Sequence, residues 1–255
     1  MRYPFTTGIS AIDYVLLDPH VKPVKDEWMA EEPLLMPECW VCFGSFSPEP
    51  ISETIPCERN GMVTFGSLNN PYKVTREAIA VWSRIMNEVP NSRFLYVRPE
   101  LSSLVLCNNL IREFGQHGIG PERLYFVNNW KTGLSHLSYY DEIDITLDTF
   151  PLVGGTTTCD ALWMGAPLIT KYGPSMHQRL GYSVLTNVGL QELCVETDDA
   201  YVEKAVALAN DPESLTLLRR ELRPALQASA LCRSQDYARN FFNLMDQLVE
   251  RHQLR

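Results

Sequence analysis

The segment from Ile143 to Gly165 constrains the fold most strongly, because it reads as a strand, a glycine-rich turn and a helix in succession. Apolar residues alternate up to Leu147, Gly154-Gly155 marks a turn, and three threonines then begin an amphipathic helix. The first turn of a helix has unpaired N–H groups and about half a positive charge, so it can bind an anion. The sequence therefore predicts a phosphate site here; the simpler alternative is a turn followed by a helix N-cap.

The side chains that follow the glycine pair strengthen the phosphate interpretation. Thr156 and Thr157 place hydroxyl donors at the expected N-terminus of the helix, where phosphate oxygens would lie. Asp160 lies one turn further along, at a spacing that allows its carboxylate to reach a ribose hydroxyl. The three side chains together predict a nucleotide diphosphate as the ligand.

The rest of the chain alternates strands with helices, which predicts an α/β fold with a Rossmann-like parallel sheet. Strands are expected at residues 13–17, 38–43, 63–67, 93–97, 123–127, 143–147 and 167–170. Helices are expected at residues 75–89 with Thr75 as N-cap, 101–114, 135–140, 177–188, 198–210, 212–229 and 234–252, and after the glycine pair. Ligands of such sheets bind beyond the carboxyl ends of the strands.

Three parts are expected along the chain. Residues 1–45 hold two strands that cannot bury a core by themselves, residues 46–60 are rich in Pro, Ser and Glu and are expected to be a linker, and residues 61–255 form the α/β lobe. Two strands without a core must lean on another part of the protein or on a partner.

Composition excludes several function classes. The net charge of −9, without a lysine- or arginine-rich run, disfavours a nucleic-acid partner. No apolar run approaches the roughly 20 residues that span a bilayer, and no signal peptide begins the sequence, so a cytoplasmic protein is expected. Seven cysteines, an odd number, indicate reduced thiols, and the lone Cys39–Cys42 pair lacks the second ligand pair of a zinc ribbon.

Two further loops at strand ends carry candidate binding residues. The first contains Asn70, Tyr72 and Lys73, and Lys73 could neutralise the charge of a diphosphate; a lysine taken alone is more often a solvated surface residue. The second extends to Lys131 and is followed by His136, which could contact a nucleobase, ribose or phosphate; a lone histidine is also commonly a structural residue.

Missing motifs narrow the chemistry. The sequence has neither the P-loop pattern nor a G-x-G-x-x-G after its first strand, which disfavours a P-loop NTPase and a nicotinamide dehydrogenase. It has no D-x-D pattern, so a metal-bridged diphosphate is not indicated. Neutralisation of the diphosphate would then depend on Lys73 and the helix N-terminus, with no metal and no cofactor.

Three stretches resemble a known family. These are F-G-S-L-N-N-P-Y-K-V-T (Phe65 to Thr75), L-D-T-F-P-L-V-G-G-T-T-T-C-D-A-L-W-M-G-A-P (Leu147 to Pro167), and Tyr3 to Gly8 with Ile12-Asp13-Tyr14. They are similar to the bacterial SPINDLY-like branch of the O-linked N-acetylglucosamine transferases. The resemblance implies the C-terminal half of a GT-B glycosyltransferase, whose fold has two Rossmann-like lobes.

The resemblance also implies roles for individual residues. Lys73 matches the family lysine that contacts the donor diphosphate and is required for activity. The positions implied to contact a UDP-sugar donor are Asn70, Tyr72, His136, Thr156, Thr157 and Asp160. Gly155 stands where the animal enzymes have a histidine, so one donor contact is missing or replaced.

The implied activity is inverting, metal-independent transfer from UDP-GlcNAc or a related UDP-sugar to protein Ser/Thr. The family's N-terminal lobe would precede the part that matches residues 1–45, as would the tetratricopeptide repeats of fuller members, and both are absent from this sequence. The chain is therefore expected to be inactive or weakly active alone. The alternatives are a non-catalytic UDP-sugar-binding or scaffold module that needs a partner lobe and, less favoured, another GT-B activity such as a sugar-nucleotide epimerase.

Overall fold

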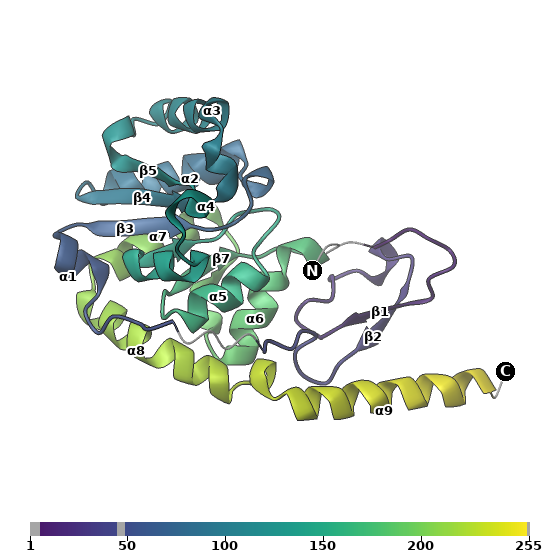
Figure 1. Ribbon diagram of the computed structural model, residues 1–255. Helices are drawn as coiled ribbons and strands as arrows, with labels where there is room; N and C mark the ends of the chain where they lie inside the picture. Colours follow the sequence, from purple (N-terminus) through teal and green to yellow (C-terminus); the bar gives the residue numbers. More distant parts are fainter. Residues whose placement is uncertain (1–5, 45–48, 254–255) are drawn as a thin grey trace.

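The structure, a computed structural model, describes residues 6–44 and 49–253 and contains a six-stranded parallel sheet (Figure 1). Its strands lie in the order β5-β4-β3-β6-β7-β8. Their bounds are β3 Val63–Ser67, β4 Ser92–Val97, β5 Leu124–Val127, β6 Ile145–Leu147, β7 Leu168–Lys171 and β8 Cys194–Val195. The chain fills one half of the sheet outward from β3 and then the other half outward from β6. The strand order therefore reverses between β3 and β6, the point where such folds bind ligands.

Helices cover both faces of this sheet. One face packs against α2 (Arg76–Glu88), α3 (Leu104–Gly115) and α7 (Asp198–Ala209), and the other against α5 (Thr156–Trp163) and α6 (Leu180–Val188). Helix α8 (Pro212–Ala228) contributes to both cores. Alternate residues of β4 separate accordingly, with Phe94 and Tyr96 in the first core and Leu95 and Val97 in the second.

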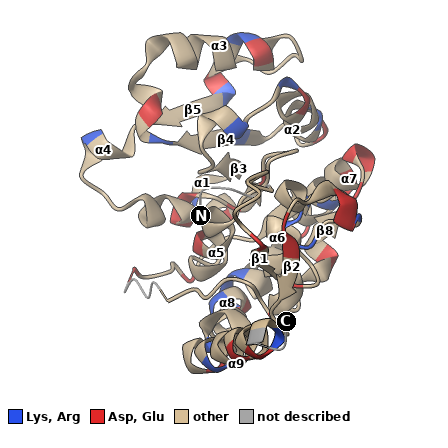
Figure 2. Cartoon of the chain, turned by 90° about the vertical axis from the view of Figure 1, so that its right-hand side faces the viewer, with Lys and Arg blue, Asp and Glu red and all other residues tan. Residues whose placement is uncertain are grey.

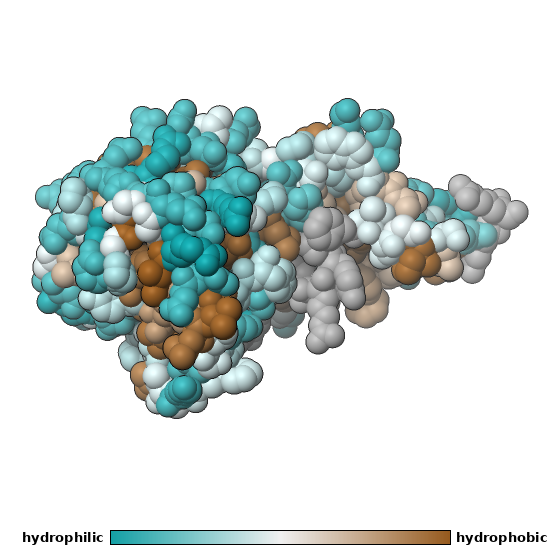
Figure 3. All heavy atoms as spheres, turned by 90° about the horizontal axis from the view of Figure 1, so that it is seen from above, coloured by the Kyte–Doolittle hydropathy of each residue, from teal (hydrophilic) through white to brown (hydrophobic). Residues whose placement is uncertain are grey.

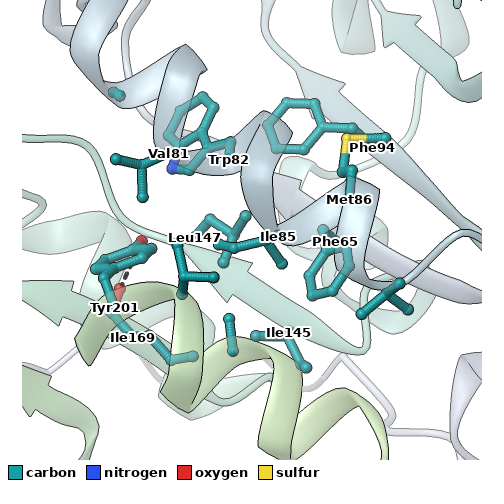
Figure 4. Packing of buried hydrophobic residues seen from close by; sticks show 14 of the residues in the cluster. Phe65, Val81, Trp82, Ile85, Met86, Phe94, Ile145, Leu147, Ile169 and Tyr201 are labelled. Carbon is teal, nitrogen blue, oxygen red and sulfur yellow. Dashed lines mark hydrogen bonds between the residues drawn. The ribbon is translucent and has the colours of Figure 1, made fainter. Parts of the chain in front are cut away.

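The first core contains aromatic side chains that are almost completely buried (Figure 4). Trp82 of α2 stacks on Phe94 of β4 with ring centroids 5.1 Å apart. Tyr201 of α7 donates its hydroxyl to the carbonyls of Asp148 and Ile169, at 3.0 and 3.1 Å. Helix α7 thereby fixes the ends of two adjacent strands where the ligand site is expected.

Thr75 caps α2 as its sequence position predicts, since its hydroxyl accepts the Ala78 amide at 3.1 Å. The same hydroxyl donates to the carbonyl of Phe150, in the turn after β6. One threonine therefore fixes both the start of α2 and the backbone of that turn.

Residues 6–44 form a small two-stranded parallel sheet of β1 (Tyr14–Leu17) and β2 (Glu32–Leu35). Figure 1 shows this segment beside the large lobe, with α9 (Ser234–Gln253) extending along it. Asp18 is fully buried and joins the two parts, because it accepts the Trp40 amide at 3.0 Å and the Ser183 hydroxyl of α6 at 2.6 Å.

Some expected elements are wrong or incomplete. Residues 38–43 do not form a strand: the Trp40 amide bonds to Asp18 and the Phe43 amide to the Leu231 carbonyl, so no strand ladder forms. Several helices begin with or consist of a 3-10 turn: Pro99–Ser102 before α3, His136–Glu142, and Met176–Gln178 before α6. Helices and strands that the pattern did not predict are β2, α1 (Pro56–Asn60), α4 (Asn129–Thr132) and β8.

Helix α1 lies inside the expected linker, whose residues 46–48 are outside the described ranges, as are Tyr3 and Pro4 of the N-terminal motif. The division into three parts stays a prediction. In Figure 2 the positions of acidic and basic residues are interspersed along the ribbon of the helices, for example along α9. Within residues 6–44 and 49–253, no helix has the length and apolar character needed to cross a membrane.

Candidate functional site

A cavity of about 380 Å³ lies at the carboxyl ends of the central strands, within the size range of small-molecule sites. Four of the residues that line it are ones that the sequence singles out: His136, Thr156, Thr157 and Asp160. The remaining lining residues follow β3, β4 and β5 or end β4; they are Leu68, Val97, Arg98, Pro99, Asn129 and Trp130. The structure therefore brings the predicted phosphate and ribose groups to one hollow, at the N-terminus of α5.

Helix α5 begins at Thr156, with Gly155 as its N-cap residue. In a helix, the amides of the first turn have no carbonyl partner within the helix, so those of Thr156 and Thr157 are available to a ligand. The Gly154 amide is not available, because it donates to Asp148 Oδ1 at 2.7 Å. The anion site is therefore narrower than the glycine pair suggests and begins after Gly154.

Lys73 lies beside this turn and ends the 3-10 helix Pro71–Lys73. Its ammonium donates to the Val153 carbonyl at 2.9 Å, next to Gly154. Burial lowers the pKa of Lys73, the negative charge of Asp148 opposes that change, and the nearby Arg98 lowers the pKa further. Lys73 is not among the residues that line the cavity. Its ammonium instead contacts the turn that precedes α5.

Asp148 directly follows β6 and is fully buried behind the turn. Its Oδ1 accepts the side-chain amide of Asn69 and the Thr149 and Gly154 amides, and its Oδ2 accepts the Thr170 hydroxyl. Burial raises the pKa of Asp148, and these donors together with the charge of Lys73 act in the opposite direction. The carboxylate thus organises the backbone that precedes α5.

Gly154 is required by the shape of this turn. A Cβ there would lie 2.8 Å from the hydroxyls of Thr157 and Thr158 and 3.0 Å from Asp148 Oδ1. All three side chains are short, and those of Thr157 and Asp148 are held by hydrogen bonds, so they have little freedom to move away. The glycine is therefore explained by close approach of side chains on both sides of the turn.

Thr157 is held by two contacts at the start of α5. Its hydroxyl donates to Asn69 Oδ1 at 2.9 Å, and its carbonyl accepts the hydroxyl of the buried Tyr140 at 3.1 Å. The loop after β3 and the helix after β6 are therefore joined by side-chain hydrogen bonds. These bonds link the segments on the two sides of the strand-order reversal.

His136 and Asp160 approach each other across the cavity wall. The His136 Nε2 and Asp160 Oδ2 atoms are 3.5 Å apart, with the imidazole half exposed and the carboxylate mostly buried. This places a donor and an acceptor side by side, a pair suited to hydroxyl groups such as those of a ribose.

Arg98 is a second cation at the site. It makes a bidentate pair with Glu100, with N···O distances of 2.9 and 3.0 Å, and the same carboxylate accepts the Asn70 side-chain amide at 3.4 Å. The hydrogen bond to Glu100 raises the pKa of Arg98 and lowers that of Glu100, while burial opposes both changes. The guanidinium is therefore oriented before any ligand arrives.

The other predicted residues lie around the cavity without lining it, among the residues that the structure describes. Asn70 accepts the Tyr72 amide at 3.3 Å and caps the 3-10 helix that ends at Lys73. Tyr72 has 74% of its surface exposed, and Lys131 is exposed on α4. Gly155 serves as the N-cap of α5.

Sequence reasoning missed Arg98, Asn69 and Asp148 as candidate site residues. Each follows directly after, or within two residues of, a predicted strand, and that position was the available signal. No group of three or more His, Cys, Asp or Glu side chains arranged to hold a metal occurs in the part of the chain that the structure describes.

Comparison with known proteins gives the family. Residues 57–241, most of the chain, match the model of glycosyl transferase family 41. The chain belongs to this family. Family 41 relatives in plants include the tomato (Solanum lycopersicum) and Petunia hybrida proteins named "Probable UDP-N-acetylglucosamine--peptide N-acetylglucosaminyltransferase SPINDLY". They are 34% and 37% identical to this chain over 98% and 93% of its length, but the chain spans only 27% and 26% of theirs.

Among solved structures, this family 41 chain is similar to a K341M mutant of the O-GlcNAc transferase of Thermobaculum terrenum. The TM-score is 0.86 at 27% sequence identity, over 96% of this chain and 46% of that one. The predicted fold, an α/β lobe with a Rossmann-like parallel sheet from the C-terminal half of a GT-B glycosyltransferase, is confirmed. The similarity to SPINDLY proteins is confirmed as well.

Proposed function

We propose that this chain is the nucleotide-sugar-binding lobe of an O-GlcNAc transferase-like glycosyltransferase, with UDP-GlcNAc or a related UDP-sugar as donor and protein Ser/Thr as acceptor. The observation that supports this proposal most strongly is the cavity at the N-terminus of α5, which is lined by Thr156, Thr157, Asp160 and His136. The names of the family 41 relatives support the donor and the acceptor. Placement in a bacterial SPINDLY-like branch is part of the proposal.

In this proposal the diphosphate lies against the first turn of α5. The Thr156 and Thr157 amides and the Thr156 hydroxyl would donate to phosphate oxygens, and Asp160 with His136 would bind the ribose. Asn70, Tyr72, Lys131 and Gly155 border this site and are proposed as donor contacts that form when the ligand is bound.

Transfer would be inverting and independent of metal. An acceptor hydroxyl attacks the anomeric carbon and gives up its proton to the solvent, while the bond from that carbon to the diphosphate oxygen breaks and UDP leaves with the electron pair. Lys73 is the proposed catalytic residue, because an ammonium beside Val153 can stabilise the charge that develops on the leaving diphosphate. Arg98 supplies a second positive charge at the same rim.

A second candidate is a non-catalytic UDP-sugar-binding module that acts only beside a partner lobe. The observation that favours it is the length: the chain spans about a quarter of its plant relatives and less than half of the solved relative. We expect the 255-residue chain to bind UDP but to show neither transfer to an acceptor peptide nor hydrolysis of UDP-GlcNAc. Release of UDP in either assay would favour the first candidate, a catalytically active glycosyltransferase.

Titration calorimetry with UDP, with and without magnesium, tests both candidates. Wild-type protein should bind UDP equally well in the two buffers, and Lys73→Met and Thr156→Val should each weaken binding at least about tenfold, since a hydrogen bond to a charged group contributes about 1.5–3 kcal/mol. Lys204→Met and Thr216→Val, on α7 and α8, are matched controls that should bind normally.

GDP and ADP titrated in parallel report which base the site accepts. Absence of UDP binding by the wild-type protein, or tighter binding of another nucleotide, would contradict the proposed donor.

A further inference from the structure

Asp148 has a complete set of donors around a buried carboxylate. The contacts are the side-chain amide of Asn69 at 2.9 Å, the Thr149 amide at 2.9 Å, the Gly154 amide at 2.7 Å and the Thr170 hydroxyl at 2.7 Å. A carboxylate only accepts hydrogen bonds, and an array of four donors favours its ionised form. A negative charge therefore lies directly behind the glycine turn.

This charge determines the direction of the next two hydrogen bonds. Because Asp148 accepts, Asn69 must present its NH₂ group to it and its carbonyl oxygen to Thr157. The Thr157 hydroxyl must then donate to Asn69. The Thr157 hydroxyl proton is therefore used in a hydrogen bond within the protein. Of the two threonines, Thr156 is the one whose hydroxyl can donate to a ligand.

The same charge acts on the proposed catalytic ammonium. Lys73 sits on the 3-10 helix after β3, and the charged groups that face it are Asp148 after β6 and Arg98 after β4, with Arg98 itself paired to Glu100. Asp148 is thus the one negative charge that opposes both the burial of Lys73 and the repulsion from Arg98, among the described groups that act on this lysine. Tyr140 and Tyr201 also lie near Asp148, and burial keeps their hydroxyls protonated by raising their pKa values.

We propose that Asp148 is a positioning residue for the diphosphate site: through Asn69 it sets the direction in which Thr157 donates, and its charge keeps the Lys73 ammonium protonated beside Val153. This inference rests on the proposed nucleotide-sugar function. It adds a role for a carboxylate that is not among the residues that line the cavity.

The test is the pH dependence of UDP binding in wild-type protein and in Asp148→Asn. Loss of the charge should move the basic limb of the affinity profile to lower pH by about one unit or more, because an opposite charge nearby shifts a pKa by one to three units. UDP titrates identically in both series, so the difference between the profiles reports protein groups. A merely structural role would lower affinity equally at every pH.

Asp144→Asn is the matched control. Asp144 directly precedes β6, and Asp148 directly follows it. Asp144 is also buried, with 2% of its surface exposed, and its carboxylate accepts the Cys57 and Thr64 amides at 2.8 Å. Its neutralisation should lower the unfolding temperature without moving the basic limb. Parallel profiles for Asp148→Asn and wild type, or equal shifts in both variants, would overturn the inference while leaving UDP binding itself established.

Asn69→Ala tests separately whether the hydrogen bonds of Asn69 matter for UDP binding. It also replaces Asp148→Asn as the test if circular dichroism shows that Asp148→Asn does not fold. This variant keeps the charge, so it should bind UDP several-fold more weakly with an unmoved basic limb. Asn87→Ala, whose side chain is exposed and bonds to the His117 carbonyl, is its control. Wild-type affinity in Asn69→Ala would overturn the hydrogen-bond arm. Failure of wild-type protein to bind UDP would instead remove the proposed function and this inference together.

Discussion

In the turn after β6, four backbone carbonyls each accept a hydrogen bond from a side chain. The Asp148 carbonyl accepts from Tyr201, the Phe150 carbonyl from Thr75, the Leu152 carbonyl from Thr149 and the Val153 carbonyl from Lys73. With its carbonyls bonded to the protein, the turn presents the amides of the following helix to the cavity. The anion site is thus preorganised at the level of single residues.

Gly154 gives a prediction at this scale. Gly154→Ala should destabilise the protein by about 1–3 kcal/mol, because the added methyl group overpacks the network between Thr157, Thr158 and Asp148. UDP affinity should fall with it. Urea unfolding measures the first effect and calorimetry the second.

Gly115→Ala is the comparison, because a Cβ at this last residue of α3 meets no atom within 4 Å. It should be neutral or stabilising by about 0.4–1 kcal/mol. Equal stabilities of Gly154→Ala and wild type would show that the turn tolerates a side chain.

Site residues could be predicted from the sequence where they lie close together in one short segment. Thr156, Thr157 and Asp160 lie on one helix start, so their convergence follows from helix geometry. Asn69 and Arg98 join the site from other strands. The contact of Asn69 with Thr157 depends on how β3 and β6 align, and Arg98 lines the cavity because β4 lies beside β3. Asp148 directly follows a predicted strand, but that position does not predict its burial behind the turn or its hydrogen bonds to the turn.

At the scale of elements, long periodic segments were predicted well and short ones were not. Helices α2, α7, α8 and α9 begin and end within two residues of their expected bounds. Strand β8 has only two residues, too few to show alternation. Residues 38–43 have the composition of a strand, but Cys39 and Phe43 are buried against helices of the lobe rather than in a sheet.

The segment with β1 and β2 gives a pH-dependent prediction. Glu31 accepts the Thr6 hydroxyl at 2.6 Å, the Thr7 amide at 2.6 Å and the Thr7 hydroxyl. Burial by itself would raise the pKa of Glu31, but these bonds outweigh it and lower the pKa from 4.5 to about 2. A depressed carboxyl pKa stabilises the folded state fully above 4.5, and the contribution is lost as the pH falls toward about 2.

Glu31→Gln should therefore be less stable than wild type at pH 6, and the difference should narrow at pH 3. Chemical unfolding midpoints at the two pH values provide the measurement. Glu88→Gln, at an exposed position of α2, is the control for a change of net charge. A stability difference that is the same at pH 3 and pH 6 would contradict the role of the Glu31 carboxylate.

At the scale of the whole molecule, the extension formed by residues 6–44 and α9 projects beside the lobe, and apolar residues reach its surface in Figure 3. Phe242 and Val249 of α9 are 65% and 54% exposed and lie seven residues apart, on one side of the helix. Val24 and Trp28 are exposed on the other part of the extension. Exposed apolar side chains of this kind are typical of a surface that contacts another part of the protein or a partner.

The double variant Phe242→Gln, Val249→Gln should bind less of a hydrophobic dye such as ANS, since it removes two exposed apolar side chains from one helix face. Its UDP affinity should equal that of wild type, because neither residue lines the cavity. Unchanged dye fluorescence would show that this helix face is not an apolar surface in solution.

The central claim is that the first turn of α5, together with Lys73, holds the diphosphate of a nucleotide. A crystal structure of the chain with UDP bound tests it most directly. We predict phosphate oxygens within hydrogen-bond distance of the Thr156 and Thr157 amides and the Lys73 ammonium, with the ribose at Asp160. A diphosphate bound elsewhere, or one that leaves Lys73 bonded to Val153 and out of reach, would contradict the account.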